Sequence, residues 1–200
     1  MATPEPIRRV FASDNYAGIC PEGWRALERG NHGHAQSYGD DAWTAHAADL
    51  IRATFETDCE VFFVFNGTAA NALSLASMGQ SYHSILCHEI AHVETDECGA
   101  IEFFSNGMKV LKVAGDDGKV LPRGIEERVK NRTDIHYPKP GAVSLSQATE
   151  VGTVYSLAEL RAIGETCRTL GLTLHMDGAR FADAVAGLGG TPQELTWEVG

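Results

Sequence analysis

The sequence has no long apolar run and no cluster of basic residues. No segment approaches the roughly 18 uninterrupted apolar residues that a membrane-spanning helix needs. The 16 Lys and Arg are outnumbered by 27 Asp and Glu, and the formal net charge of −11 argues against the clustered positive charge with which proteins bind nucleic acids. The N-terminal residues contain charges but lack the apolar region of a secretory signal. We therefore expect neither nucleic acid nor membrane as a partner.

Paired cysteine motifs are also missing. The five cysteines are scattered, odd in number and contain no C-x-x-C pair, which is typical of free thiols in a cytoplasmic protein. Hydrophobic residues at 44% and charged residues at 22% are ordinary for a soluble globular protein, and 200 residues are enough for one sizeable domain. The expected location is the cytoplasm.

Short apolar runs alternate along the chain with segments whose apolar residues recur at helical spacing. Strands are predicted at Glu60–Phe65, Ser84–Cys87, Lys109–Val113, Ala142–Leu145 and Leu172–Met176. Helices are predicted at Ala42–Phe55, at Thr68–Met78, at Pro122–Asn131, from a capping box at Ser156 to about Leu170, and from Thr191 onward. This alternation predicts βαβ units, hence a mainly parallel sheet with helices on both faces. We expect an irregular arm with a first helix at residues 1–40 and one larger domain at residues 41–200.

The residues that follow each strand are the candidates for a site, because open parallel sheets bind ligands beyond the carboxyl ends of their strands. Gly67 and Thr68 follow the first strand and open a helix, where free backbone N–H groups and a hydroxyl suit a phosphate. An ordinary helix N-cap is the simpler alternative. Neither a Walker P-loop nor a dinucleotide-binding glycine motif is present.

The segment HEIAH matches the H-E-x-x-H pattern, in which His88 and His92 would share a helical face and bind zinc, with Glu89 as the base. Three observations weigh against this pattern. The motif directly follows a strand, the residues after it form no apolar stripe, and Thr95 and Cys98 stand where the extended motif has Gly and His. A zinc hydrolase is therefore a distant alternative, and we expect no metal.

Asp177 ends the last predicted strand, and Arg180 follows three residues later. Two interpretations are open. The pair can be a helix N-cap and its solvated neighbour. Alternatively, the carboxylate meets a cation at the ligand edge of the sheet and the guanidinium meets an anion. Pyridoxal phosphate would present both charges. Its pyridinium nitrogen is the cation that an acid faces, and its phenolate oxygen or the substrate carboxylate is the anion that a positive group faces.

Together these motifs resemble the threonine aldolase branch of the fold-type I pyridoxal-phosphate enzymes, within the wider β-eliminating lyase superfamily. The resemblance spans nearly the whole chain, and it is specific because six blocks occur in the family's order and spacing. The blocks are FASDNYAG (Phe11–Gly18), SYGDD (Ser37–Asp41), FNGTAAN (Phe65–Asn71), HEIAHVETDECGA (His88–Ala100), LSQATEVGTVY (Leu145–Tyr155) and LHMDGAR (Leu174–Arg180). The resemblance implies the three-layer αβα large domain of the aspartate aminotransferase-like class, without its C-terminal small domain.

The resemblance also implies roles for individual residues. Gly67 and Thr68 would bind the phosphate of pyridoxal 5'-phosphate, and His92 would stack on the pyridine face. Asp177 would pair with the ring nitrogen and keep it protonated. Arg180 would reach the O3′ side of the cofactor and help to hold the substrate carboxylate.

Two further residues are implied in the N-terminal part of the chain. Ser13 would contact the substrate carboxylate, and Tyr38 would approach the active site of a neighbouring subunit. The family builds its sites at a dimer interface, so the resemblance implies a homo-oligomer, a dimer of dimers (homotetramer).

The implied reaction is retro-aldol cleavage of a β-hydroxy-α-amino acid, L-threonine or allo-threonine, to glycine and acetaldehyde. His92 or a bound water would take the proton of the β-hydroxyl, and the sequence leaves both open. The closest alternative is a β-eliminating lyase that acts on an aromatic or sulfur amino acid. A non-catalytic binding module is the third.

The family's Schiff-base lysine follows the Asp-x-x-Arg strand, and no lysine of this chain does so. All of them precede Asp177: Lys109, Lys112, Lys119, Lys130 and Lys139. We expect that lysine, the small domain and a second carboxylate-binding arginine to lie beyond Gly200. The 200 residues alone are expected to be inactive, or nearly so, and marginally folded.

Overall fold

The computed structural model describes residues 12–200, so Phe11 of the first motif block lies outside the described residues. The chain divides into two compact units, a first that ends at Ile51 and a second from Arg52 to Gly200. Each unit is described by itself. The predicted division between residues 40 and 41 concerns the whole protein and stays a prediction.

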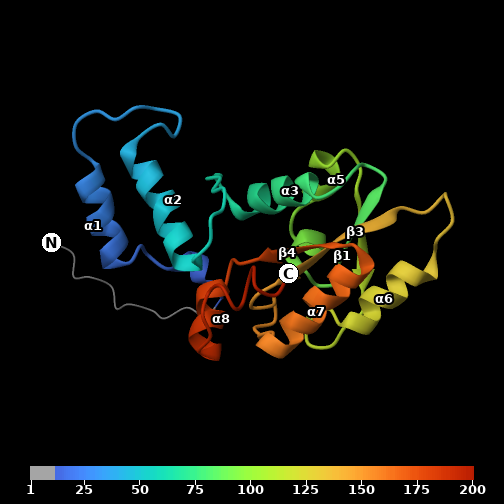
Figure 1. Cartoon of the computed structure of the whole chain (residues 1–200). Helices are drawn as coiled ribbons and strands as arrows, with labels where there is room; N and C mark the ends of the chain where they lie inside the picture. Colours follow the sequence, from blue (N-terminus) through green and yellow to red (C-terminus); the bar gives the residue numbers. More distant parts are fainter. Residues whose placement is uncertain (1–11) are drawn as a thin grey trace. The chain divides into compact units, whose positions relative to one another are not determined.

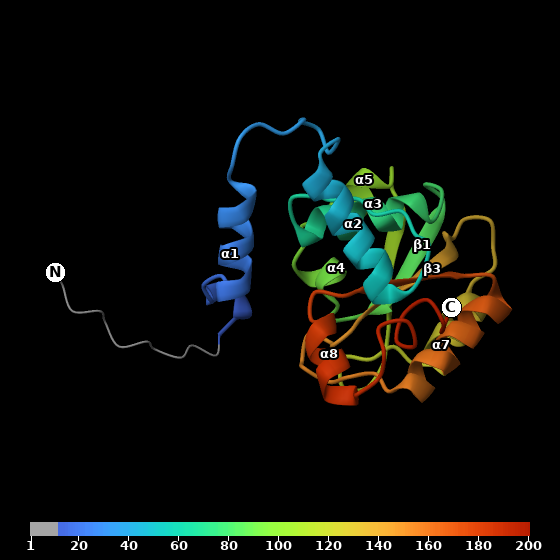
Figure 2. The same ribbon diagram turned by 60° about the vertical axis from the view of Figure 1, so that its left-hand side comes forward.

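The described part of the first unit is built from helices (Figure 2). It contains η1 (Asp14–Tyr16), α1 (Pro21–Gly30) and the start of α2 (Ala42–Phe55). α1 begins where the Cys20 Sγ accepts a hydrogen bond from the Gly23 amide (3.4 Å), with Pro21 in the first turn. Apolar side chains of this unit line a cavity of about 960 Å³, among them Ile19, Trp24, Leu27 and Trp43.

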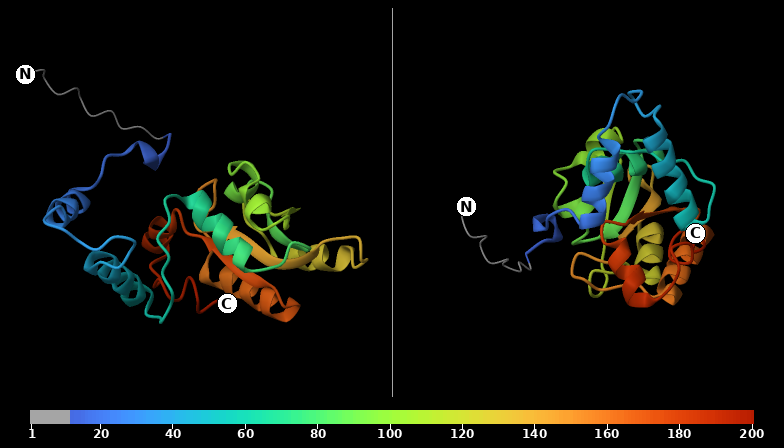
Figure 3. Two further views of the ribbon diagram at one scale, coloured as in Figure 1. Left: turned by 90° about the horizontal axis from the view of Figure 1, so that it is seen from above. Right: turned by 90° about the vertical axis from the view of Figure 1, so that its left-hand side faces the viewer.

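The second unit is a parallel sheet covered by helices on both faces (Figures 1 and 3). Its strands run in the order β2-β1-β3-β4, and they are β1 (His83–His88), β2 (Lys109–Val113), β3 (Lys139–Ser146) and β4 (Thr173–Asp177). One face carries α3 (Gly67–Ser77), α4 (His92–Thr95) and α5 (Ala100–Phe104). The other carries α6 (Pro122–Asn131) and α7 (Leu157–Leu170), and α8 (Phe181–Leu188) follows β4.

Two apolar cores fill the space between the layers, because alternate residues of a strand point to opposite faces of the sheet. On β1, Leu86 packs with Val143 of β3 and Leu160 of α7. Its neighbour Ile85 belongs to the second core, with Leu75 of α3. All these side chains are fully buried. The two cores therefore fix the sheet between its helical layers.

The structure confirms the mainly parallel three-layer α/β fold and most of the predicted elements. The helices at Ala42–Phe55 and Pro122–Asn131 and the strand at Lys109–Val113 have the predicted bounds. The capping box at Ser156 is present, and Gly171 ends α7 in the left-handed conformation with a φ of 68°. The sequence did not predict α4, α5 or α8. α4 and α5 have only four and five residues, too few to give a periodic pattern.

The predicted strand at Glu60–Phe65 is wrong. These residues form an irregular segment, and the side chains of Phe62 and Phe65 are 82% and 89% exposed. β-propensity alone does not make a strand, because a strand needs a partner for its backbone hydrogen bonds. Within the described residues, none of the four strands pairs with this segment.

The helix predicted from Thr191 onward is also wrong, because residues 192–198 form hydrogen-bonded turns. The local start signal is present, since Thr191 and Glu194 exchange hydrogen bonds between side chain and backbone. The helix does not continue because tertiary contacts direct the chain. Leu195 and Val199 are buried in the core, and the Trp197 indole donates to the Phe55 carbonyl (2.7 Å).

His175 makes the stability of the second unit depend on pH. It is buried in the middle of β4, and its Nδ1 lies 2.9 Å from the Ser144 Oγ. Burial lowers the pKa of His175 from 6.5 to about 4, although the charge of Asp177 acts in the opposite direction. As the pH falls below about 6.5, His175 is therefore protonated in the unfolded chain before it is protonated in the folded chain, and this favours unfolding.

We predict that the free energy of unfolding is highest above the unfolded pKa of His175 and falls as the pH drops toward about 4. The contribution of this residue is on the order of 3 kcal/mol. Urea unfolding between pH 7 and 4 measures it, and His175→Asn should flatten the slope. His32→Gln is the control, because His32 is exposed. Equal slopes in the wild type and His175→Asn would contradict the prediction.

Candidate active site

Three of the strands end at the same edge of the sheet and bring polar residues together there. β1 ends at His88, β3 at Ser146 and β4 at Asp177. The helix α3, which packs on one face of the sheet, adds Asn71 from its second turn. This is the edge at which the sequence places the site.

Asp177 is the last residue of β4, and both of its carboxylate oxygens accept hydrogen bonds. Oδ1 accepts from the Ala179 amide (2.9 Å), and Oδ2 accepts from the Asn71 Nδ2 (3.0 Å). These two bonds fix the carboxylate at the strand end. Each oxygen has a second lone pair, so the group can accept one more donor.

The same Asn71 amide reaches a second carboxylate. Its Nδ2 lies 2.7 Å from the Glu97 Oε1, and that oxygen lies 2.8 Å from the His92 Nδ1. Glu97 is buried, whereas the His92 side chain is 40% exposed. A chain of hydrogen bonds thus links Asp177, Asn71, Glu97 and His92.

Arg180 lies on the loop between β4 and α8 and is held by the segment after β3. Its Nε donates to the Ala148 carbonyl (3.1 Å), and its Nη2 lies 3.7 Å from the Glu150 Oε1. The same Glu150 oxygen accepts from the His92 backbone N–H (3.0 Å) and the Ser146 hydroxyl (2.5 Å). Glu150 therefore places Arg180 and His92 beside each other.

The interpretation of Asp177 as a helix N-cap with a solvated Arg180 is wrong. α8 begins only at Phe181, with Arg180 in the N-cap position and no side-chain cap hydrogen bond. Arg180 is partly buried, and the atom Nη2 is buried without a hydrogen-bond acceptor among the described residues. Such a donor is suited to an anion.

Gly67 and Thr68 form the first turn of α3. The Asn66 side chain caps the helix by accepting from the Ala69 amide (2.8 Å). In the described chain, the backbone N–H groups of Gly67 and Thr68 have no acceptor, so they are open to an anion. Asn71 lies about one turn further along the same helix, about 6 Å of axial rise from Gly67.

The zinc motif does not form. His88 is the last residue of β1 and His92 the first of α4, so the two rings do not share a helical face. The His88 ring is also occupied, since Nδ1 accepts from the Ile90 amide (3.3 Å) and Nε2 lies 3.3 Å from the Gly115 carbonyl. Glu89 is exposed.

A different group of side chains is close enough to hold a metal ion. Ligand atoms of His92, Glu97 and Asp177 lie within 4.8 Å of one another. The His92 Nδ1 and the Glu97 Oε1 form a hydrogen bond to each other. A metal ion that binds through these two atoms would have to break this bond.

Ser13 and Tyr38 belong to the first unit. The Ser13 Oγ accepts from the Asn15 amide (3.2 Å), next to η1. Tyr38 lies in a turn with a positive φ of 66°, and its side chain is fully exposed. Their predicted roles concern the assembled protein and stay predictions.

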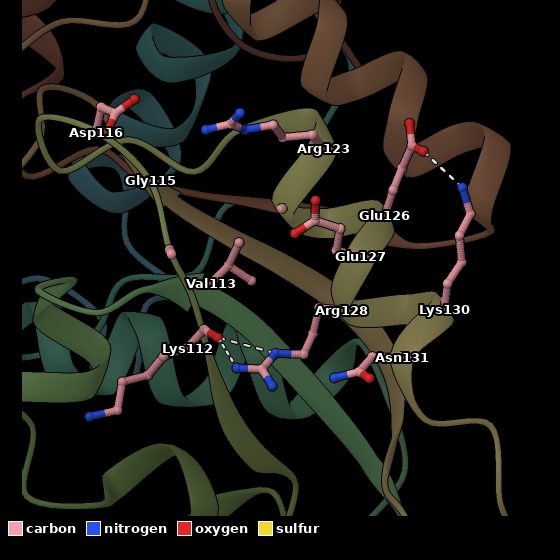
Figure 4. A pocket seen from close by; sticks show the side chains of 12 residues that line it. Lys112, Val113, Gly115, Asp116, Arg123, Glu126, Glu127, Arg128, Lys130 and Asn131 are labelled. Carbon is pink, nitrogen blue, oxygen red and sulfur yellow. Dashed lines mark hydrogen bonds and ion pairs between the residues drawn. The ribbon is translucent and has the colours of Figure 1, made fainter.

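A separate cavity of about 980 Å³ lies between β2 and α6 (Figure 4). Two interactions cross its lining, since Arg128 donates to the Lys112 carbonyl through Nε (3.1 Å) and Lys130 lies 2.8 Å from Glu126. None of the residues that line it is a predicted site residue. The cavity is therefore distinct from the candidate site.

The two buried cysteines do not contribute a nucleophile to the site. All five are free, as predicted. Burial raises the pKa of the Cys87 thiol to about 12 and that of the Cys167 thiol to about 11, so both stay protonated near neutral pH.

Residues 11–199 match the family model described as beta-eliminating lyase. The chain belongs to the beta-eliminating lyase family. A low specificity L-threonine aldolase of Pseudomonas sp. (strain NCIMB 10558) is 65% identical over 190 residues, which cover 95% of this chain and 55% of that protein. The chain thus spans about half the length of this curated relative.

Solved structures of other proteins share the fold of this beta-eliminating lyase family member. The threonine aldolase of Leishmania major matches with a TM-score of 0.85 at 32% identity, over 90% of this chain and 53% of that one. A PLP-bound C–S lyase from Staphylococcus hominis matches with a TM-score of 0.51 at 10% identity, over 76% and 39%, and shows the fold alone. The expected fold-type I architecture is confirmed.

Three residues of this lyase-family site were not predicted as functional. Asn71, Glu97 and Glu150 lie inside the motif blocks but carry no pattern of their own. The sequence did contain a signal for Asn71, because it is a polar residue one turn after Gly67 in a helix rich in Ala and Leu. Glu97 and Glu150 are recognised only from contacts with His92, and Glu150 is 58 residues away from it.

We predict that Asn71→Ala lowers the free energy of unfolding of this lyase-family chain by about 2 kcal/mol, because two carboxylates lose a shared donor. The better helix propensity of alanine offsets about 0.5 kcal/mol of the loss. Urea unfolding measures the change. Ser77→Ala on the same helix is the control, since its exposed hydroxyl donates to the nearby Ser74 carbonyl. Equal stability of the two variants would contradict the account of the site.

Proposed function

We propose that this chain forms the cofactor-binding part of a pyridoxal 5'-phosphate-dependent aldolase. The enzyme cleaves L-threonine or allo-threonine to glycine and acetaldehyde. The observation that carries the proposal is the placement of Asp177, His92 and Arg180 at one edge of a parallel sheet, beside the open N-terminus of α3. The resemblance to L-threonine aldolases supports the choice of reaction.

The residues present fit the cofactor. Asp177 has acceptor capacity for a protonated ring nitrogen, and Arg180 has a buried donor atom without a hydrogen-bond acceptor among the described residues. The free N–H groups at Gly67 and Thr68 suit the phosphate, and no atom outside the neighbouring residues lies within 4 Å of a Cβ built at Gly67.

Each residue then has a role in the reaction. Asp177 keeps the ring nitrogen protonated, and Arg180 holds an anionic oxygen of the cofactor or the substrate carboxylate. His92 stacks on the ring, and either His92 or a water takes the proton of the β-hydroxyl. When bound, pyridoxal phosphate serves as the sink for the electron pair released at Cα.

The proposal extends to the whole protein. Ser13 contacts the substrate carboxylate and Tyr38 approaches the site of a neighbouring subunit, in a homotetramer built as a dimer of dimers. Residues 41–200 are part of the cofactor-binding domain, and residues 1–40 form the arm. The protein acts in the cytoplasm on a small amino acid. No helix among the described residues is both long and apolar enough to cross a membrane.

The test uses protein produced from the complete coding sequence, because no lysine of residues 1–200 has the context of the family's covalent lysine. We predict release of acetaldehyde from L-threonine or L-allo-threonine and no release of pyruvate from sulfur amino acids. Release of pyruvate without acetaldehyde would contradict the aldolase proposal and indicate a β-eliminating lyase. No product in either assay would refute both.

We predict that Asp177→Asn lowers kcat for acetaldehyde release by about 10²-fold, because an amide does not hold the ring nitrogen protonated. Asp183→Asn is a matched control, since Asp183 is an exposed carboxylate on the adjacent α8. Stopped assays at saturating substrate measure kcat for each of the two variants. A kcat of Asp177→Asn equal to that of the control would rule out the assigned role.

A further inference from the structure

Glu97 is a buried carboxylate whose hydrogen-bond partners, within the described residues, both belong to the candidate site. Its side chain has 0% exposure, and its Oε1 lies 2.7 Å from the Asn71 Nδ2 and 2.8 Å from the His92 Nδ1. Its Oε2 is buried and has no partner in the described chain. A buried carboxylate is costly unless it is paired, so these two donors hold the group in place.

The contact with Glu97 decides which nitrogen of His92 carries a proton. An ionised carboxylate only accepts hydrogen bonds, so the His92 Nδ1 donates. In the neutral ring, the lone pair then lies on Nε2. Nε2 has no hydrogen-bond partner among the described residues, and the side chain is 40% exposed.

A second carboxylate fixes the backbone of the same residue. The His92 N–H donates to the Glu150 Oε1 (3.0 Å), which also lies near Arg180. Glu150 sits on the segment after β3, which is braced by the pairing of Gln147 with the Tyr155 backbone (2.9 and 3.0 Å). Ring and backbone of His92 are therefore held from two different segments of the chain.

We infer that Glu97 is a positioning residue that keeps His92 in the tautomer whose Nε2 accepts the proton of the substrate β-hydroxyl. The inference rests on the proposed function and decides between the two candidate bases in favour of His92. It gives a role to a carboxylate that does not itself touch the substrate.

The proton balance of the step is simple. The O–H bond of the substrate hydroxyl breaks, and an N–H bond forms at the His92 Nε2. The positive charge that appears on the imidazole is held against the Glu97 carboxylate, 2.8 Å from Nδ1. The proton taken from the hydroxyl balances the one that glycine gains at Cα.

The first test needs no activity. Ring ¹⁵N NMR of the chain without cofactor reports the tautomer of each of its eight histidines, and His92→Phe assigns the His92 signals. We predict Nδ1–H with a bare Nε2 in the wild type. In Glu97→Gln the amide can donate to Nδ1 and favour the Nε2–H form, and in Glu97→Ala both forms should be populated.

The second test uses protein from the complete coding sequence. Glu97→Gln should lower kcat by about 10²-fold or more, because the wrong tautomer removes general base catalysis, while KM changes much less. Glu94→Gln is the matched control. Glu94 is a carboxylate of α4, the short helix that begins at His92, and is paired with Lys112 at 2.8 Å. Its kcat should equal that of the wild type.

The outcomes separate the two proposals. A wild-type His92 with Nε2 protonated overturns the positioning role, and so does a tautomer that neither Glu97 variant changes. The wild-type spectrum alone tests the predicted tautomer of His92, even if the variants do not fold. Absence of lyase activity and of cofactor binding in the wild type would refute the proposed function, whereas an unchanged kcat in Glu97→Gln would refute only the role of Glu97.

Discussion

The side-chain amide of Asn71 lies between two carboxylates and is the donor that they share. It contacts Glu97 at 2.7 Å and Asp177 at 3.0 Å. These residues come from α3, from the turn after α4 and from the end of β4. One NH₂ group, with two protons directed to two acceptors, thus connects three segments of the chain at the ligand edge of the sheet.

The remaining site residues depend on this connection. Glu97 orients the ring of His92, and Glu150 binds both the backbone of His92 and the guanidinium of Arg180. The first turn of α3, with its open N–H groups, is fixed relative to Asp177 through Asn71. The carboxylate of Asp177, the guanidinium of Arg180, the ring of His92 and the N-terminus of α3 are therefore connected by hydrogen bonds and one ion pair.

The sequence predicted the parts of this arrangement that follow from local patterns. The parallel sheet follows from the alternation of strands and helices, and Asp177 was a site candidate because it ends a strand. Gly67 was a candidate because it opens a helix, although the strand predicted before it does not form, and the role of His92 came from the family resemblance. The segment Glu60–Phe65 was predicted wrongly because an apolar run does not reveal whether a strand partner exists. The carboxylates of Glu97 and Glu150 were missed because their role arises from contacts made in the folded chain.

The central claim is that Asp177 faces the nitrogen of a pyridoxal phosphate ring, and ¹⁵N NMR of cofactor labelled at that nitrogen tests it most directly. The cofactor is bound to protein from the complete coding sequence, and the spectrum is recorded across the neutral pH range. The account predicts a protonated ring nitrogen throughout that range, because the carboxylate stabilises the charged form. A bound cofactor with an unprotonated ring nitrogen at neutral pH would contradict it.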